Sequence, residues 1–506
     1  MNLRAVTNAI ASVLIIVGAA MLTAVPVGLA MGDPPAVLRV LLYCALGTMA
    51  VSGLVVILAR HGQTLVFGFH EGFAVVSLSW VAATLVGALP YLLIADLRWY
   101  DAIFETMSGF TTTGASVIER GLPLRSGGAL SQGLADLPAA LLYWRALTHW
   151  LGGMGIVVLS VAIMPWLGLG AQQLFRAEVP GPTHDRITPR IADSAKILWG
   201  VYLTLTLLQT GLLCLSGMSW FDAWCHACAT VATGGFSTRQ ESLAFYHSAT
   251  IEAITILFMF LSGVNFLLHY RALRGEWRCL WKDEEFRFYT AVCLLATASI
   301  ALVVTGRSIV TTAGEVIPSA SYLTSLRYAA FQVVSIVTTT GFVTADFNPW
   351  PAYCAAVLVL LMYLGGCAGS TAGGMKQSRI LLLLRYGVFQ VERCLFRRTM
   401  SNVRFNGQRI DPIVLHKILA FFFLFMAINV AVTLALCLLG VGDLVTAATA
   451  TLSSLANVGP GLGQVGATST YAWMPPAAKL LLSFTMLLGR LELYTVLVMF
   501  LPSFYR

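Results

Sequence analysis

The chain has 506 residues, of which 58% are hydrophobic and only 11% are charged. Soluble domains carry about 25% charged residues, so this composition excludes an ordinary water-soluble protein. It indicates that the lipid bilayer is the solvent for most of the surface. The ten cysteines lack the paired spacing of a disulfide framework, and a metal site at Cys225, His226 and Cys228 lacks a second ligand pair, so we interpret these residues as core.

Ten apolar runs of membrane-spanning length occur along the chain. In chain order they cover 5–30, 37–59, 70–97, 138–169, 194–217, 248–271, 286–308, 352–396, 413–440 and 475–501. The first is too long for a signal-peptide core and lacks a strongly basic start, so we expect it to be retained. Between spans 3 and 4, 5 and 6, 7 and 8, and 9 and 10 lie shorter apolar segments, which fit re-entrant helices.

Ten spans place both termini on one side of the membrane. The loops on that side are much richer in Arg and Lys than the opposite loops, so the positive-inside rule predicts cytoplasmic termini and re-entrant segments that open to the outside. The basic residues on the side of the termini are Arg176, Arg186, Arg190, Lys196, Arg271, Arg274, Arg278, Lys282, Lys376, Arg379, Arg385, Arg393, Arg397, Arg398, Arg404 and Arg409. The opposite loops contain Arg98, Arg120, Arg125, Arg239, Arg307 and Arg327.

Four short segments, each after a re-entrant segment, align with one another. They are SGFTTTGAS (108–116), ATVATGGFS (229–237), SIVTTTGFV (335–343) and SLANVGPGL (454–462), and the glycines they share are Gly114, Gly234, Gly341 and Gly459. One glycine turn is a weak motif and four ordinary glycine-rich loops are the alternative, but four such turns between paired spans predict an internal repeat. The predicted divisions are two extra spans (1–66) and repeats over 67–172, 173–280, 281–398 and 399–506.

Helix-capping residues begin the predicted half-helices. Asp101, Asp222 and Asp443 open three of them, and Ser325 or Thr324 opens the fourth, because Asp, Ser and Thr are common N-cap residues. Each half-helix then directs its partially negative C-terminal end at a glycine turn, which favours a cation there.

The turns suit a selectivity filter for a monovalent cation. Backbone carbonyls can replace the water shell of an ion without adding fixed charge, and glycine permits the unusual dihedrals that aim them at one axis. Intramembrane Glu105 is expected to hold the first turn from behind, with direct ion contact as the alternative. The predicted ion-binding residues are Thr112, Thr113, Ala232, Thr233, Thr339, Thr340, Asn457 and Val458, followed by the four glycines; Asn457 and Val458 make the filter pseudo-symmetric.

The chain resembles the TrkH/TrkG bacterial potassium-uptake subunits of the Trk/Ktr/HKT superfamily over nearly its whole length. Besides the four turns, the similar segments are HWLGGMGIVVL (149–159), AEVPGPTHDRITPRIADSAKILW (177–199), SGVNFLLHY (262–270), GGCAGSTAGGMK (365–376) and GRLELYTVLVMFLPSFYR (489–506). Position 372 is alanine where glycine is common in the family, a change expected to stiffen its loop slightly.

The resemblance implies an all-α polytopic fold with four pore helices in pseudo-fourfold arrangement, as in potassium channels. It implies potassium transport, a homodimer in the bacterial inner membrane surrounded by lipid, and a cytosolic regulator of the TrkA type. ATP/ADP or NAD/NADH would bind only to that regulator, and this chain is expected to carry no covalent cofactor and to bind no nucleic acid. A loop within the eighth span would gate the pore under the filter.

The residues of the eighth span agree with such a loop. Its five glycines within ten residues cannot sustain a helix, and irregular backbone at membrane depth needs surrounding protein or a water-filled cavity. Arg490, inside the last span, needs a partner; we expect it to contact loop carbonyls and help to close the pore, with structural pairing to a Glu as the alternative. The predicted gating loop comprises Gly365, Gly366, Gly369, Ser370, Thr371, Gly373, Gly374 and Lys376.

The sequence leaves three alternative functions to consider. In the superfamily, serine in place of the first filter glycine accompanies sodium conduction, so Gly114 favours potassium over a sodium or mixed-cation transporter. Tyr100-Asp101 and the Gly440–Asp443 stretch are similar to motifs of intramembrane aspartyl proteases, but N-capping explains these aspartates better, and no enzyme activity is expected. A scaffold or receptor would not need four filter-like turns.

Overall fold

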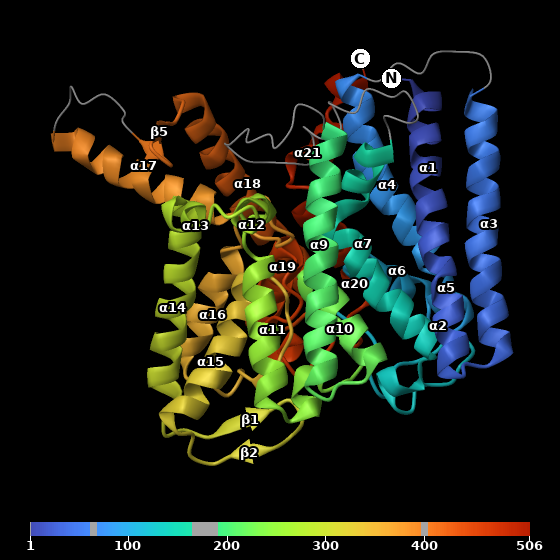
Figure 1. Ribbon diagram of the computed structural model, residues 1–506, viewed down its shortest axis with the longest axis horizontal. Helices are drawn as coiled ribbons and strands as arrows, with labels where there is room; N and C mark the ends of the chain where they lie inside the picture. Colours follow the sequence, from blue (N-terminus) through green and yellow to red (C-terminus); the bar gives the residue numbers. More distant parts are fainter. Residues whose placement is uncertain (1, 61–67, 164–190, 396–402, 506) are drawn as a thin grey trace.

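The computed structural model describes residues 2–60, 68–163, 191–395 and 403–505, and these are mostly helical (Figure 1). The chain begins with α1 (Leu3–Leu22), α2 (Ala24–Met31) and α3 (Pro35–Arg60), which pack beside α4 and α7. Asp33, between α2 and α3, accepts hydrogen bonds from the backbone N–H groups of Ala139 (3.0 Å) and Ala140 (2.7 Å). This carboxylate caps the start of α7 and fixes the N-terminal helices to the rest of the protein.

A four-part pattern then repeats along the chain: a span, a short buried helix, a turn and a second span. The first spans are α4 (Phe69–Gly87, extended by α5, Leu89–Leu93), α9 (Ile191–Leu215), α14 (Glu284–Val304) and α18 (Pro412–Leu438). The short helices, which we call pore helices, are α6 (Trp99–Phe110), α10 (Trp220–Val231), α15 (Tyr322–Val337) and α19 (Leu444–Ala456). Their residues are mostly buried, whereas the first spans expose Leu and Val side chains, as expected of helices that face lipid.

All four second spans are broken, although the sequence predicted a break only in the eighth span. The first, α7 (Ala139–Ile163), is kinked at Gly155. The second bends by 102° between α11 (Ala249–Ser262) and α12 (Phe266–Leu273), and the fourth by 111° between α20 (Pro476–Arg490) and the segment formed by α21 (Tyr494–Leu497) and η4 (Val498–Phe500). The third consists of α16 (Ala352–Tyr363) and α17 (Gln377–Leu395), joined by the predicted loop.

The predicted helical membrane fold is confirmed. Within the described residues, six helices are long and apolar enough to cross a membrane, and the two bent pairs bring that number to eight. The remaining predicted spans, 138–169 and 352–396, correspond to the kinked α7 and the broken α16–α17 pair. Short strands form the other regular structure: β1 (Ile309–Thr311) pairs antiparallel with β2 (Val316–Ile317) and β3 (Ala345–Asp346), and β4 (Arg404–Phe405) with β5 (Gln408–Arg409).

Short helices complete the described structure. They are α13 (Arg278–Lys282), η1 (Gly133–Asp136), η2 (Ser242–Tyr246), η3 (Gly463–Val465) and η5 (Pro502–Tyr505).

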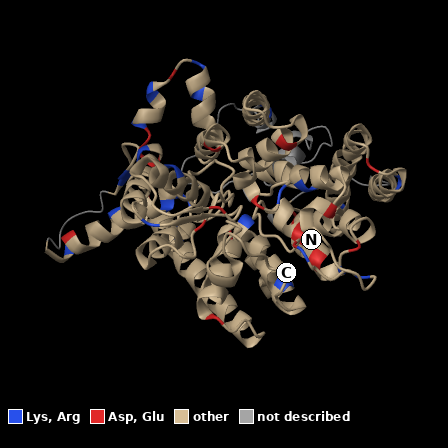
Figure 2. Cartoon of the chain, turned by 90° about the horizontal axis from the view of Figure 1, so that it is seen from below, with Lys and Arg blue, Asp and Glu red and all other residues tan. Residues whose placement is uncertain are grey.

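Both chain ends lie at the same end of the molecule, and β1 and β2 lie at the opposite end (Figure 1). Helices α12 and α13 lie toward the end with the termini; α12 carries Arg271, α13 carries Arg278 and Lys282, and Arg274 lies between the two helices. Charged residues are sparse over the rest of the helices (Figure 2). The predicted basic positions Arg176, Arg186, Arg190, Arg397 and Arg398 lie outside the described residues, as does most of the 177–199 segment.

Candidate ion pathway

The four turns that follow the pore helices have the same backbone geometry. Each begins with a non-glycine residue of positive φ: Thr112 (52°), Thr233 (54°), Thr339 (55°) and Asn457 (55°). The next residue donates its N–H to a carbonyl of the pore helix at 2.8–2.9 Å, in the pairs Thr113–Ser108, Gly234–Ala229, Thr340–Ser335 and Val458–Ser453. A glycine of positive φ follows: Gly114 (80°), Gly235 (80°), Gly341 (81°) and Gly459 (104°).

This geometry corrects the predicted alignment of the second turn. Gly235, and not Gly234, is equivalent to the glycines of the other three turns. Gly234 therefore corresponds to Thr113, and Thr233 corresponds to Thr112. Ala232 lies one position before Thr233. The sequence contains two adjacent glycines here, and glycine type alone does not show which of them adopts the left-handed conformation.

The four turns meet around a closed ring. We call Gly114, Gly235, Gly341 and Gly459 the turn glycines. A Cβ atom built on each of them would collide with the carbonyl oxygen of the residue immediately before the turn glycine of another repeat. A side chain at these positions would therefore displace a backbone oxygen. The pairs are Gly114 with Gly234 (2.1 Å), Gly235 with Thr340 (2.0 Å), Gly341 with Val458 (2.1 Å) and Gly459 with Thr113 (2.6 Å).

The ring offers neutral oxygens, and helix C-termini point toward it. The carbonyls of Thr113, Gly234, Thr340 and Val458 belong to it, and each pore helix ends just before its turn, with the partially negative end of its dipole nearest the ring. Among the described residues, no group of three or more His, Cys, Asp or Glu side chains could hold a metal ion. This arrangement can replace the hydration shell of a monovalent cation without trapping it by fixed charge.

A small vestibule lies on one side of the ring, which we call the outer side. Its volume is about 110 Å³, and its lining includes Gly114, Gly235, Gly341 and Gly459. Tyr471 also lines it, and its hydroxyl donates a hydrogen bond to the carbonyl of Gly459 at 2.9 Å. Val343, two residues before β3, also lines the vestibule, which therefore lies on the side of the ring nearer the β1–β3 sheet.

A buried ion pair supports the first turn, and the sequence predicted only half of it. Glu105 accepts hydrogen bonds from the N–H of Val117 (3.0 Å), the hydroxyl of Ser116 (3.0 Å) and Nε of Arg145 (2.7 Å). The guanidinium of Arg145 also lies 3.4 Å from the ring centroid of Phe236, in the second repeat. These contacts support a scaffolding role for Glu105; Arg145 was missed because it lies within an apolar span, 40 positions from Glu105.

His149 links the first two repeats. Its Nδ1 lies 2.7 Å from the carbonyl of Gly109, in the first pore helix, and its Nε2 accepts the N–H of Phe236 at 3.2 Å. A Cβ atom on Gly234 would lie 2.4 Å from the ring of His149. The imidazole therefore fills the space directly behind the second turn, which explains why a side chain at position 234 would not fit.

The 365–376 loop lies at the end of the ring opposite the vestibule, which we call the inner end, and it contacts three repeats. The N–H of Gly373 donates to Oγ1 of Thr339 at 2.7 Å, and the hydroxyl of Thr371 donates to the carbonyl of Val231 at 3.0 Å. A Cβ atom on Gly373 would lie 2.3 Å from the carbonyl of Ala456. Since Val231, Thr339 and Ala456 lie in or next to three of the turns, the tip of the loop lies against the inner side of the ring.

The base of the loop is also fixed. Leu364 and Met375 form a β-bridge, and the N–H of Gly365 donates to the carbonyl of Met375 at 2.7 Å. Gly365, Gly366, Gly369 and Gly374 have little room for a side chain, because a Cβ atom on each would lie 2.0 to 3.0 Å from a neighbouring atom. Nζ of Lys376 donates a hydrogen bond to the carbonyl of Ala372. The hydroxyl of Ser370 donates a hydrogen bond to the carbonyl of Cys367 at 2.6 Å.

Arg490 connects the loop to the first repeat, so the predicted contact with loop carbonyls is confirmed. Its Nη1 donates to the carbonyl of Thr371 at 2.8 Å. Its Nη2 donates to the carbonyls of Gly152 (2.5 Å) and Gly153 (3.0 Å) in α7. One side chain of the fourth repeat therefore joins the loop of the third repeat to the second span of the first.

Three of the four predicted helix caps are wrong. The side chain of Ser219 caps α10 by accepting the N–H of Asp222, and the side chain of Ser321 caps α15 by accepting the N–H of Thr324. The side chain of Asp101 does not cap α6. Asp443 does cap α19, accepting from the N–H groups of Val445 and Thr446. Hydrogen bonds from Thr446 hold the pKa of Asp443 below its usual value, so this cap is charged at neutral pH.

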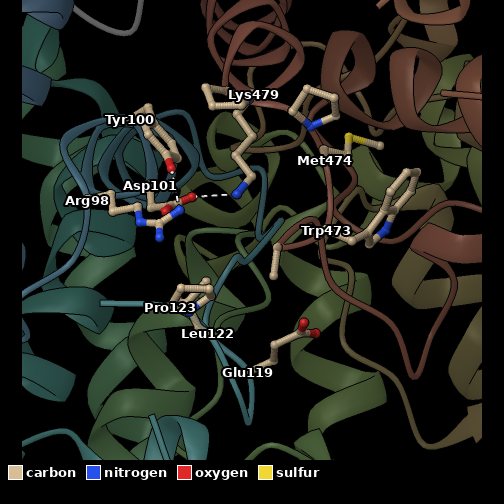
Figure 3. A pocket seen from close by; sticks show the side chains of 12 residues that line it. Arg98, Tyr100, Asp101, Glu119, Leu122, Pro123, Trp473, Met474 and Lys479 are labelled. Atoms are coloured by element: carbon tan, nitrogen blue, oxygen red, sulfur yellow. Dashed lines mark hydrogen bonds and ion pairs between the residues drawn. The ribbon is translucent and has the colours of Figure 1, made fainter. Parts of the chain in front are cut away.

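Asp101 instead pairs with Lys479, and both residues line a pocket of about 440 Å³ between the first and fourth repeats (Figure 3). Their Oδ1 and Nζ atoms are 2.5 Å apart and both side chains are 3% exposed. Arg98, also in the pocket wall, donates to the hydroxyl of Tyr100 at 2.9 Å. The ion pair fastens the first pore helix to the last span.

Comparisons with known proteins agree with this architecture. Residues 45–504 match the TrkH family, described as "Cation transport protein". The chain is 39% identical to the Trk system potassium uptake protein TrkH of Salmonella typhimurium, covering 86% of each protein, and 37% identical to TrkH of Escherichia coli, covering 91% of this chain and 96% of that one. The crystal structure of the potassium transporter TrkH from Vibrio parahaemolyticus matches all of both chains, with a TM-score of 0.84 and 33% sequence identity.

These similarities extend through the pore helices, the turns and the 365–376 loop. On the match to residues 45–504 and on the identity to its relatives, the chain belongs to the TrkH family of cation transport proteins.

Proposed function

We propose that this chain conducts potassium into the bacterial cytoplasm through the axis between its four turns. The observation that carries the proposal is the closed ring of turn glycines and carbonyl oxygens. The similar proteins of Salmonella typhimurium and Escherichia coli are named potassium uptake proteins, and Gly114 is the residue expected of a potassium filter. Membership of a transport family replaces the aspartyl-protease alternative, and the chain is not an enzyme.

The proposed conduction needs no catalytic group. An ion entering from the vestibule would exchange water for the carbonyls of Thr113, Gly234, Thr340 and Val458. The membrane potential supplies about 2.3 kcal/mol per charge per 100 mV, which corresponds to roughly fifty-fold accumulation. The neutral ring lets the ion leave on the inner side.

We further propose that the 365–376 loop closes this pore and that Arg490 keeps it closed. The loop tip lies against the inner side of the ring through Thr339 and Ala456, so an ion leaving the ring would meet loop backbone. The contact between Arg490 and the carbonyl of Thr371 holds the tip in place. Opening would require the loop to move away from the turns of the second, third and fourth repeats.

The proposed setting is the inner membrane, with both termini in the cytoplasm, the four repeats divided as the sequence predicts, and two copies of the chain forming a homodimer. The basic residues of α12 and α13, at the end of the molecule that carries the termini, support this orientation. The loop would be released by a cytosolic nucleotide-binding regulator of the TrkA type.

Flux through purified full-length protein in liposomes tests the proposal. With a potassium gradient and a candidate regulator, we expect potassium flux well above that of protein-free liposomes. No flux under any regulator condition would contradict it. Reversal potentials in mixed potassium and sodium distinguish the sodium alternative, because equal permeability would defeat potassium selectivity. Gly114→Ser should lower the preference for potassium, since its Cβ would displace the carbonyl of Gly234, 2.1 Å away.

A further inference from the structure

Glu285, at the start of α14, holds both sides of the 365–376 loop with one oxygen. Its Oε1 accepts hydrogen bonds from the N–H of Ala368 and from the N–H of Ser378, each at 2.8 Å. Ala368 lies within the loop, and Ser378 lies in the first turn of α17. Glu285 is only 5% exposed, so a buried carboxylate joins the loop to the helix that follows it.

The contact of Glu285 is far from that of Arg490 along the loop. Glu285 and the carbonyl of Gly263, which accepts the N–H of Cys367 at 2.8 Å, hold the beginning of the loop. Arg490 holds Thr371, near the tip. Because the tip reaches the ring only if the beginning of the loop is in place, the carboxylate sets the position from which the tip extends.

The two residues before Glu285 hold the segments that follow the loop. Oε2 of Glu284 lies 2.5 Å from Nη1 of Arg385, in the middle of α17. Oδ2 of Asp283 accepts a hydrogen bond from Nδ2 of Asn406 at 2.9 Å, in the turn between β4 and β5. Three consecutive acidic residues therefore fix the loop, α17 and the β4–β5 hairpin to the start of one span.

We propose that Glu285 is a positioning residue of the gate, which keeps the 365–376 loop beneath the ring by fixing its beginning to the first turn of α17. This inference rests on the proposed function, but the position of the loop can be measured without measuring ion flux. A movement of α17, which projects from the body of the molecule (Figure 1), would be transmitted to the loop through this shared oxygen.

Three variants separate the hydrogen bonds from the charge. Glu285→Ala removes both hydrogen bonds that hold the beginning of the loop to α17, so we expect regulator-independent flux in liposomes to rise about tenfold or more. Glu285→Gln keeps an oxygen that can accept both N–H groups and should stay within about threefold of the natural protein. Glu276→Gln is the control for the loss of an acidic charge, because Glu276 pairs with Arg271 in an exposed ion pair away from the loop, and its flux should also stay close to that of the natural protein.

Alkylation of Cys367 measures the loop directly, without ion flux. This loop thiol is 1% exposed, and Cys293, in the body of α14, is 4% exposed. In Glu285→Ala, maleimide labelling followed by peptide mass spectrometry should rise at Cys367 and remain unchanged at Cys293. If Glu285→Ala yields too little folded protein, Glu285→Asp, whose shorter side chain cannot reach both donors, should give the same pattern at smaller amplitude.

Unchanged labelling of Cys367 in these variants would overturn the inference, and so would an equal rise at Cys293, because the effect would then be general unfolding. If the natural protein conducted no ion with any regulator while Glu285→Ala still exposed Cys367, the proposed function would fail and the positioning role would stand.

Discussion

Nζ of Lys479 and Oδ1 of Asp101 lie 2.5 Å apart, although 378 positions separate the two residues in the chain. Lys479 is the fourth residue of α20, and the fourth residue of α11, Glu252, pairs with Arg327 of another pore helix. The junctions from the second to the third repeat and from the fourth to the first therefore use ion pairs of opposite polarity. A second span is joined in each to a pore helix of the next repeat.

Removal of Lys479 should destabilise the protein strongly. Lys479→Met leaves the carboxylate of Asp101 buried without its partner, so we expect a loss of about 3 kcal/mol in unfolding free energy, measured as a lower thermal midpoint in detergent. The double variant Asp101→Leu, Lys479→Met removes both charges and should recover most of this loss. Arg125→Met, which breaks the exposed pair with Asp96, should leave the thermal midpoint almost unchanged. A double variant no more stable than Lys479→Met would contradict this account.

Gly235→Ala should abolish flux. Its Cβ would lie 2.0 Å from the carbonyl oxygen of Thr340, a backbone atom that cannot move without opening the ring. Gly121→Ala is a matched control, because Gly121 has nearly the same φ (81°) but no atom within 4 Å of an added Cβ. It carries the same backbone strain and should conduct normally. Wild-type flux in Gly235→Ala liposomes would show that this glycine does not line the pathway.

Arg490→Ala should raise flux in the absence of a regulator. The side chain donates to the carbonyls of Thr371, Gly152 and Gly153, and hydrogen bonds from a charged donor contribute about 1.5–3 kcal/mol each. Loss of even one should favour the released loop by tenfold or more. Arg409→Ala removes an exposed arginine elsewhere and should leave flux unchanged. A leak equal to that of the natural protein would argue against a closing role for Arg490.

Glu105→Ala should weaken the first turn. The change leaves the guanidinium of Arg145, which is 3% exposed, without its carboxylate, and leaves the N–H of Val117 unpaired. We expect a loss of about 3–5 kcal/mol in stability and a reduced preference for potassium over sodium. Thermal unfolding and reversal potentials measure the two effects. Unaltered selectivity in a folded Glu105→Ala protein would show that the pair supports the fold alone.

The sequence allowed the repeat, the pore helices, the loop contact of Arg490 and the support by Glu105 to be predicted. These features depend on local signals: apolar run length, glycine turns, and charges inside spans that need a partner. The break between α20 and α21 was not predicted, because Glu492 (φ 54°) and Leu493 (φ 56°) adopt left-handed conformations that their residue types disfavour.

Long-range pairing accounts for most of the other differences between the sequence predictions and the structure. Asp101 was expected to cap a helix. Its actual partner, Lys479, could not be predicted because it lies 378 positions away in the chain. Glu285 resembles any acidic residue in the first turn of a helix until the loop, 83 positions later, is placed beside it. The register of the second turn depended on which of two adjacent glycines has positive φ, which only the arrangement of the ring decides.

The most direct test is to locate the ion. Crystals of the protein grown with rubidium in place of potassium should show anomalous density on the axis between the carbonyl oxygens of Thr113, Gly234, Thr340 and Val458. Density at that ring, absent in crystals grown with sodium alone, is the result the account predicts. An empty ring in rubidium, with the ion bound elsewhere in the protein, would contradict it.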